Sequence, residues 1–150
     1  MSGKTSIAVL GGGSWGTALA HLLAHAGHSV ALLLRDAEQA AHINAHHENP
    51  RYLRGVPLHP GIRAVAGDTG GPEQAEVLAG VSILVLSVPC QAMRGTLRRL
   101  GGRCAPGLRS CQYGKRNRSF RAGYGGAHGP GRAARIRGPL RRPFRAVVRP

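Results

Sequence analysis

The residues of this 150-residue sequence with the clearest chemical pattern form one glycine-rich segment, Gly11-Gly12-Gly13-Ser14-Trp15-Gly16. The segment matches G-x-G-x-x-G, in which free N–H groups at a helix start meet the pyrophosphate of a dinucleotide. Gly11 would permit the tight turn, Gly13 would let the backbone approach the pyrophosphate, and Gly16 would let the helix pack close to the strand. The pattern alone is weak evidence, and it becomes strong only between a strand and a helix.

The charged pair Arg35-Asp36 follows at the distance where such a site meets the adenosine ribose, about 20 residues further on. A carboxylate there favours NAD, whereas an arginine accommodates the 2′-phosphate of NADP. Arg35 is the better placed for a 2′-phosphate, and Asp36 is interpreted as a helix cap. The pair therefore favours NADP, while NAD and an ordinary solvated charge pair stay open.

The eight histidines and three cysteines offer other chemistry. His21/His25 and His42/His46 are each four residues apart, but no Asp, Glu or Cys completes a site at metal-ligand spacing. We interpret them as solvated surface histidines and predict no metal site. An odd cysteine count without C-x-x-C indicates neither a disulfide framework nor a zinc knuckle, and Cys90 has no neighbouring base that would make it reactive. We predict no catalytic residue.

The segments around these residues alternate between strand and helix patterns. Short apolar runs rich in β-formers predict strands at Ser6–Leu10, Ser29–Leu34, Ile62–Ala66 (the weakest) and Ser82–Val88. Helical spacing and capping residues predict helices at Ala18–Ala26, from the cap Asp36 to about His46, at Pro72–Ala79 and at Gln91–Leu100. The alternation predicts an α/β fold, a Rossmann-type doubly wound parallel sheet.

Charge divides the chain, whose formal net charge is +15. All six acidic residues lie within the first 76 residues, whereas residues 101–150 contain none and hold 13 of the 21 Lys and Arg residues. Beyond about Gly101 we predict no regular structure, because apolar content is too low to offset the entropy of ordering the backbone. The expected organisation is an NAD(P)-binding domain at residues 1–107 and an irregular or disordered basic tail at residues 108–150.

Three segments within roughly Lys4–Leu100 together resemble the N-terminal domain of bacterial NAD(P)-dependent glycerol-3-phosphate dehydrogenase: VLGGGSWGTALAHLLAHAGHSVALLLRD, INAHHENPRYLRGVPL and VLSVPCQAMRGTLRRL. That family reversibly reduces dihydroxyacetone phosphate to sn-glycerol 3-phosphate for glycerophospholipid synthesis. The resemblance implies NADP or NAD as cofactor and leaves a homodimer open for the full-length enzyme. It implies cofactor contacts at Ser14, Trp15, Arg35 and Tyr52, with Val88-Pro89 near the nicotinamide.

The sequence departs from this family further on. The family's K-G-I-E and L-S-G-P-S-F-A segments do not occur as written, and the later helical domain with a general acid/base lysine is missing. Lys115 stands near the first place, but its surroundings QYGKRNR do not match, so we do not transfer the role. We therefore expect cofactor binding without catalytic competence, because hydride transfer needs a held substrate and a proton donor.

A shifted reading frame accounts for the missing segments and the basic tail together. With one choice of codons, Pro139–Pro150 read from the second base gives PFAVLSGPSFA, and Cys111–Ser119 at the same offset gives ANTAKGIEA. Two matches in order and in one frame favour a slip between about Leu100 and Cys111, close to Gly107. Out-of-frame translation of a GC-rich gene yields mostly Arg, Gly, Pro and Ala.

Two alternative functions stay open. The first is another oxidoreductase with a related N-terminal domain, acting on a different hydroxy or keto substrate. The second is a non-enzymatic protein whose basic tail, interleaved with Tyr113, Phe120, Tyr124 and Phe144, binds nucleic acid. We rank it below a frameshift because the tail lacks a regular RGG or heptad pattern. No segment reads as a signal peptide or membrane span, so a cytoplasmic location is the default expectation.

Overall fold

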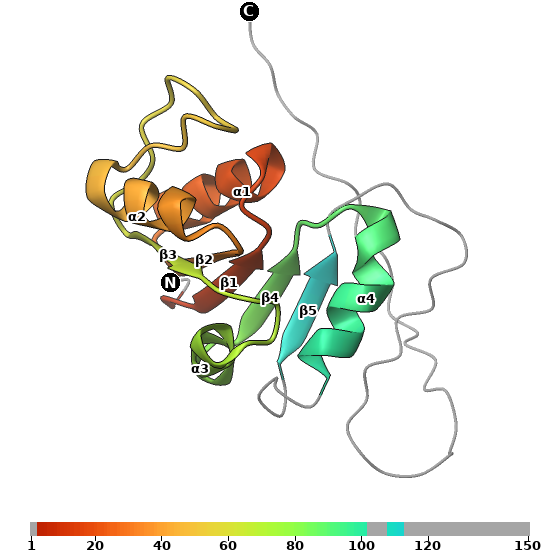
Figure 1. The fold of residues 1–150 in the computed structure, drawn as a ribbon. Helices are drawn as coiled ribbons and strands as arrows, with labels where there is room; N and C mark the ends of the chain where they lie inside the picture. The colour runs from red at the N-terminus through yellow and green to blue at the C-terminus, as the bar shows by residue number, and fades with distance from the viewer. Residues whose placement is uncertain (1–2, 102–107, 113–150) are drawn as a thin grey trace, which may run out of the picture. The chain divides into compact units, whose positions relative to one another are not determined.

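A computed structural model describes residues 3–101 and 108–112 of the chain (Figure 1). Its strands are β1 (Ser6–Leu10), β2 (Ser29–Leu34), β3 (Ile62–Ala66), β4 (Ile83–Leu86) and β5 (Arg109–Gln112). Its helices are α1 (Ser14–His25), α2 (Ala37–His46), α3 (Pro72–Gly80) and α4 (Cys90–Leu100). The predicted alternation of strands and helices is confirmed, and α1 begins four residues earlier than its apolar pattern indicated.

The five strands form one parallel sheet in the order β3-β2-β1-β4-β5. From β1 the chain first builds outward through β2 to β3, then returns to place β4 on the other side of β1. Leu10 at the end of β1 pairs with Leu33 of β2 and Leu86 of β4. This is the predicted doubly wound sheet, and its order reverses between β1 and β4, where such folds bind ligands.

Both faces of the sheet are buried, which explains why its central strands are continuously apolar. On one face, α1 and α2 cover a cluster that includes Val9, Leu32 and Ile43. On the other face, α3 and α4 contribute Leu78, Met93 and Leu100 to a cluster with the alternate strand residues. Each fully buried side chain of this size contributes roughly 1.5–3 kcal/mol, so the two clusters together fix the sheet against its helices.

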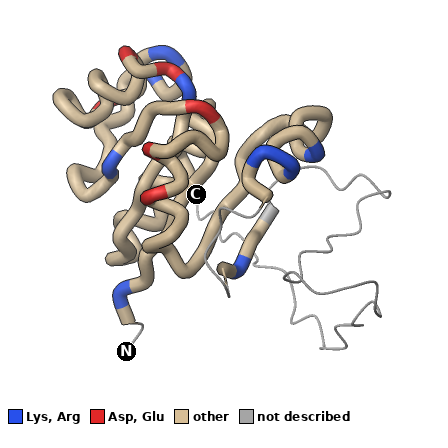
Figure 2. The backbone as a smooth tube through the Cα atoms, turned by 60° about the horizontal axis from the view of Figure 1, so that its bottom comes forward, with Lys and Arg blue, Asp and Glu red and all other residues tan. Residues whose placement is uncertain are grey.

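The ends of the helices follow from local chemistry. The Asp36 carboxylate Oδ1 accepts a hydrogen bond from the Gln39 backbone N–H at 3.1 Å, which confirms the predicted cap of α2. Pro72 occupies the first turn of α3, where its missing N–H costs nothing. Arg98 and Arg99 lie in the last turn of α4, a helix without acidic residues (Figure 2), and they complement the negative end of its dipole.

The expectation that no regular structure follows Gly101 was wrong for residues 109–112. Residues Arg109–Gln112 form β5, which pairs in parallel with β4 from Ile83↔Arg109 to Leu86↔Gln112. Backbone pairing to a sheet edge does not require apolar side chains, and Leu108 just before it packs against the core. The expectations for residues 113–150, including the disordered, out-of-frame and nucleic-acid-binding interpretations, concern residues outside those that the structure describes.

Candidate functional site

A cleft of about 860 Å³ opens at the carboxyl ends of β1, β2 and β4, where the strand order reverses. Open α/β sheets bind their ligands at this place. The cleft is lined by the glycine turn, the end of β2, the loop after α2, the segment after β4 and one side of α4. Its lining residues include Gly11, Gly12, Gly13, Arg35, Asp36, Arg51, Tyr52, Val88, Pro89 and Arg99.

The glycine turn joins β1 to α1 with no room for side chains at Gly11, Gly12 and Gly16. Gly11 has φ +122°, and a Cβ there would collide with the Ser87 carbonyl group. A Cβ on Gly16 would collide with the Gly11 carbonyl, so α1 can approach β1 only because residue 16 is glycine. By contrast, a Cβ on Gly13 would meet nothing within 4 Å. The turn is therefore packed against the sheet and open at Gly13, which lines the cleft.

The structure brings most of the predicted site residues together. Six of them line the cleft: Gly11, Gly13, Arg35, Tyr52, Val88 and Pro89. Three others do not line it. Ser14 and Trp15 start α1 with exposed side chains, Trp15 at 64%, and Gly16 is buried beneath the turn. They lie at the start of α1, which is the positive end of the helix dipole.

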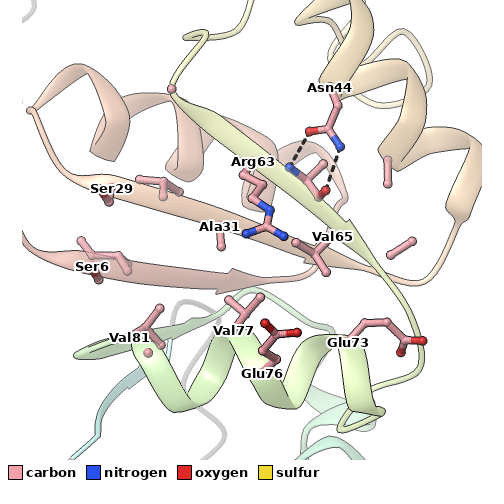
Figure 3. A pocket seen from close by; sticks show the side chains of 17 residues that line it. Ser6, Ser29, Ala31, Asn44, Arg63, Val65, Glu73, Glu76, Val77 and Val81 are labelled. Carbon is pink, nitrogen blue, oxygen red and sulfur yellow. Dashed lines mark hydrogen bonds between the residues drawn. The ribbon is translucent and has the colours of Figure 1, made fainter.

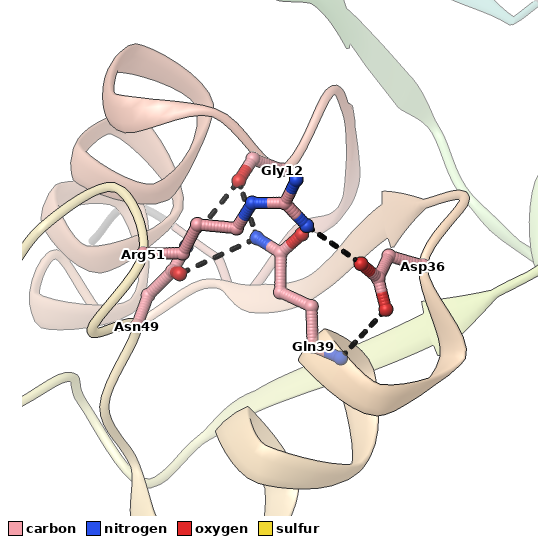
Figure 4. Close-up of polar contacts among 5 residues, drawn as sticks. All are labelled: Gly12, Asp36, Gln39, Asn49 and Arg51. Carbon is pink, nitrogen blue, oxygen red and sulfur yellow. Dashed lines mark hydrogen bonds and ion pairs between the residues drawn. The ribbon is translucent and has the colours of Figure 1, made fainter.

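The end of β2 carries an ion pair that the sequence did not indicate. Asp36 Oδ2 lies 2.8 Å from Arg51 Nη1, while Asp36 Oδ1 accepts from the Gln39 N–H (Figure 4). The Arg51 guanidinium also lies 5.5 Å from the centre of the Tyr52 ring. Because both charged side chains are well exposed, at 63% and 38%, the pair adds little to stability. Its consequence is chemical, since both carboxylate oxygens of Asp36 are already engaged beside the exposed Arg35.

Behind this ion pair lies a polar cluster that sequence reasoning also missed. Gln39 Nε2 donates to the Gly12 carbonyl at 2.6 Å, and Asn49, which is fully buried, donates to the same oxygen at 3.3 Å (Figure 4). Gly12 occupies the first x of G-x-G-x-x-G, a position at which the motif specifies no residue type and therefore predicts no role. The signal that could have found Asn49 was its place at the head of the Asn-x-Arg-Tyr-Leu segment.

A second hollow, of about 780 Å³, lies beside the edge strand β3 and reaches toward the amino ends of the strands (Figure 3). Arg63, Glu76 and Val77 are among the side chains around it. On the α2 side, Asn44 exchanges two hydrogen bonds with the backbone of Ala64, at 2.8 and 2.9 Å. This hollow does not reach the glycine turn, so the cleft at the carboxyl ends is the candidate site.

Three histidines, His21, His25 and His59, form contacts between α1 and the loop after α2. His21 Nδ1 accepts from the His59 backbone N–H at 3.0 Å, and the His21–His25 and His25–His59 ring centres lie 4.5 and 4.9 Å apart. Burial, together with the charges of His25 and His59, lowers the pKa of His21 below its ordinary value of 6.5. His21 is thus half-buried and structurally engaged, unlike the solvated histidine expected. Within residues 3–101 and 108–112, no group of three or more His, Cys, Asp or Glu could hold a metal ion.

The comparison with known families matches this geometry. Residues 6–115 match the family described as the N-terminus of NAD-dependent glycerol-3-phosphate dehydrogenase. The chain belongs to this family. The resemblance inferred from the GSWGTA, N-x-RYL and VPxQAxR segments is thereby confirmed.

Individual relatives cover the same region. Over 102 residues, the chain is 55% identical to glycerol-3-phosphate dehydrogenase [NAD(P)+] of Lawsonia intracellularis and 56% identical to that of Methylobacterium radiotolerans. These matches cover 67% and 68% of this chain but 29% of each relative. The chain therefore spans less than a third of the length of the curated relatives that it matches.

Solved structures of the family share the fold. The crystal structure of glycerol-3-phosphate dehydrogenase from Coxiella burnetii superposes with a TM-score of 0.63 at 30% identity, covering 73% of this chain and 32% of that one. The enzyme from Plasmodium falciparum gives the same TM-score and coverage at 26% identity. Among the helices that the structure describes, none has the length and apolar character needed to cross a bilayer.

Proposed function

We propose that this chain binds NADP or NAD at the β1–α1 turn and forms the cofactor half of a glycerol-3-phosphate dehydrogenase. One observation carries the proposal: a glycine turn, open only at Gly13, faces a cleft at the point where the strand order reverses. Membership of a family described as NAD-dependent supports the assignment of this cleft to a dinucleotide.

The residues present fit such a cofactor. The start of α1 at Ser14 and Trp15 offers the positive end of a helix dipole to a pyrophosphate, and the open backbone of Gly13 lets the phosphates approach closely. Val88 and Pro89 line the far part of the cleft, where they would meet the nicotinamide. When bound, the cofactor supplies the hydride for carbonyl reduction, while the residues of this chain orient it.

The adenosine end of the cleft favours NADP. One carboxylate oxygen of Asp36 accepts the hydrogen bond that caps α2 and the other pairs with Arg51, so a ribose 2′-hydroxyl would have to share an oxygen that is already engaged. Arg35 and Arg51 both line the cleft beside it. Two guanidinium groups around one neutralised carboxylate suit a 2′-phosphate, which arginine binds in bidentate fashion.

The complete reaction belongs to the whole protein of this family. We propose that it reduces dihydroxyacetone phosphate to glycerol 3-phosphate in the cytoplasm, with a homodimer as the form to test for the full-length enzyme. This chain has no K-G-I-E or L-S-G-P-S-F-A segment. We therefore expect its 150 residues to bind cofactor with negligible turnover.

We further propose that the chain from about residue 107 onward is translated out of frame. The exposed residues of β5 support this idea, because Arg109, Ser110 and Cys111 lie beside the apolar β4, whereas β1 and β2 are almost wholly buried. Sequencing the gene across residues 100–111 tests it. The expected result is a shifted frame that encodes the missing dehydrogenase segments; an uninterrupted frame with no such segments in the next frame contradicts it.

Equilibrium titration with NADPH and NADH, together with NADPH oxidation in the presence of dihydroxyacetone phosphate, tests the proposed function. We expect saturable binding, tighter for NADPH, and no measurable oxidation. A folded sample that binds neither nucleotide would overturn the assignment of the glycine turn. Tighter binding of NADH would overturn the NADP preference alone.

A further inference from the structure

Three side chains from separate parts of the chain donate hydrogen bonds to the Gly12 carbonyl. Its oxygen accepts from Gln39 Nε2 at 2.6 Å, from Asn49 Nδ2 at 3.3 Å and from Thr17 Oγ1 at 3.4 Å. The donors come from α2, from the loop that follows it and from α1 (Figure 4 draws the first two). This carbonyl is therefore held by side chains on both helices that flank the cleft turn.

The donors are also bonded to one another. Asn49 Nδ2 donates to Thr17 Oγ1 at 2.8 Å, and Gln39 Nε2 donates to Asn49 Oδ1 at 3.3 Å. Each amide nitrogen thus uses both of its N–H groups. Asn49 and Thr17 are fully buried, so any rearrangement that left one of these groups unpaired would cost about 1–3 kcal/mol. In the observed arrangement every side-chain donor of Gln39, Asn49 and Thr17 has an acceptor.

This arrangement sets the direction of the next N–H group. The described chain has no cis peptide bond, and in a trans peptide the C=O and N–H groups point in opposite directions. With the Gly12 carbonyl turned toward Gln39 and Asn49, the Gly13 N–H points away from them. Gly13 lines the cleft and its Cβ side is open.

Without such a restraint, this peptide could turn over. Glycine adopts positive and negative φ about equally well, so a Gly-Gly peptide has little intrinsic preference. A flipped Gly12–Gly13 peptide would direct the carbonyl oxygen away from the cluster and would bring partial negative charge to the place of a phosphate. Gly12 itself cannot be stiffened by a side chain, because a Cβ there would lie 2.8 Å from Leu34 Cβ.

We propose that Gln39 and Asn49 are positioning residues for the pyrophosphate of the dinucleotide, acting through the Gly12 carbonyl that they hold. The inference rests on the proposed cofactor binding. It adds a specific role for α2 and the loop after it: they orient the Gly13 N–H before the ligand arrives, so binding does not have to supply that order.

The test uses the full chain with Gln39→Met, which keeps the length and helix propensity of the half-buried side chain but removes its donors, and Gln39→Glu, which places an acceptor at the carbonyl. The matched control is Asn44→Ser on the same helix, which loses two hydrogen bonds to the Ala64 backbone, away from the cleft. Two probes are titrated: NADPH, and adenosine 2′-phosphate, which lacks the pyrophosphate bridge. Thermal unfolding is measured for every variant.

We expect Gln39→Met to weaken NADPH binding about 10- to 100-fold, the range for losing one hydrogen bond to a charged group. Gln39→Glu should weaken it further. The affinity of Gln39→Met for adenosine 2′-phosphate should stay unchanged, and Asn44→Ser should alter neither affinity. Unchanged NADPH affinity in both Gln39 variants would overturn the inference while leaving the proposed function standing. Equal losses for both probes in the neutral variant Gln39→Met would also overturn it by indicating a merely structural role. No NADPH binding by the unaltered chain would overturn both proposals.

Discussion

Replacing Gly16 by alanine is the sharpest perturbation of the turn that carries the site. The added methyl group would run into the Gly11 carbonyl, and backbone atoms cannot rotate out of its way as a side chain can. Overpacking a well-packed contact costs about 1–3 kcal/mol. Alanine in a helix gains about 1 kcal/mol over glycine, so a matched substitution is needed to separate the two effects.

Gly95→Ala supplies that match. Gly95 lies within α4, and a Cβ there would meet nothing within 4 Å. Gly95→Ala should therefore gain the helix propensity of alanine without a steric collision like that at residue 16. The two variants should differ in free energy of unfolding by about 1–3 kcal/mol, which corresponds to a Tm difference of about 4–8 °C for each kcal/mol in a domain of this size.

Thermal unfolding followed by circular dichroism measures this difference, and NADPH titration follows its effect on the site. We expect Gly16→Ala to melt well below Gly95→Ala. We also expect Gly16→Ala to bind NADPH more weakly than the unaltered chain, because α1 must shift away from β1. Equal melting temperatures for the two variants would refute the reasoning that a glycine is required for the contact between α1 and β1.

Two further predictions concern the loop after α2. Arg51→Gln should weaken NADPH binding about tenfold or more, as expected for a lost charge-assisted contact to a phosphate, and should leave NADH binding nearly unchanged. The control is Arg54→Gln, at an exposed residue of the same loop. Equal effects of Arg51→Gln on both nucleotides would contradict a 2′-phosphate role. Since the folded-state pKa of His21 lies below 6.5, the neutral ring favours the fold, and this contribution is lost as the pH falls below 6.5. In urea titrations at several pH values, the free energy of unfolding of His21→Gln should decrease less below pH 6.5 than that of the unaltered chain. An equal decrease in both proteins would contradict a role for the His21–His59 contact.

Much of the fold could be predicted because its signals are local. The strands Ser6–Leu10 and Ser29–Leu34 were found to the residue, since buried parallel strands are unbroken apolar runs. Asp36 was identified as a cap from its type and place. β5 was missed because its residues Arg109–Gln112 carry no strand pattern, and only pairing with β4 makes them a strand.

The residues of the site likewise divide into those with a local sequence signal and those without one. Gly11, Gly13, Arg35 and Tyr52 were found by motif and resemblance, and all of them line the cleft. The partners that hold the turn could not be found from spacing, because they are brought together only by the fold. Asn49 stands 37 residues from the Gly12 carbonyl to which it donates, and Gln39 stands 27 residues away. No local pattern reports a contact of that range.

The central claim is that the glycine turn of this chain binds a nicotinamide dinucleotide, and its single tryptophan offers a direct measurement. Trp15 starts α1 beside the turn with 64% of its surface exposed, and its emission overlaps the absorption of reduced nicotinamide. Titration of the folded chain with NADPH should quench Trp15 fluorescence saturably, with the same midpoint as NADPH binding measured by calorimetry. A folded sample whose Trp15 emission and calorimetric signal both stay unchanged with NADPH and with NADH would contradict the account.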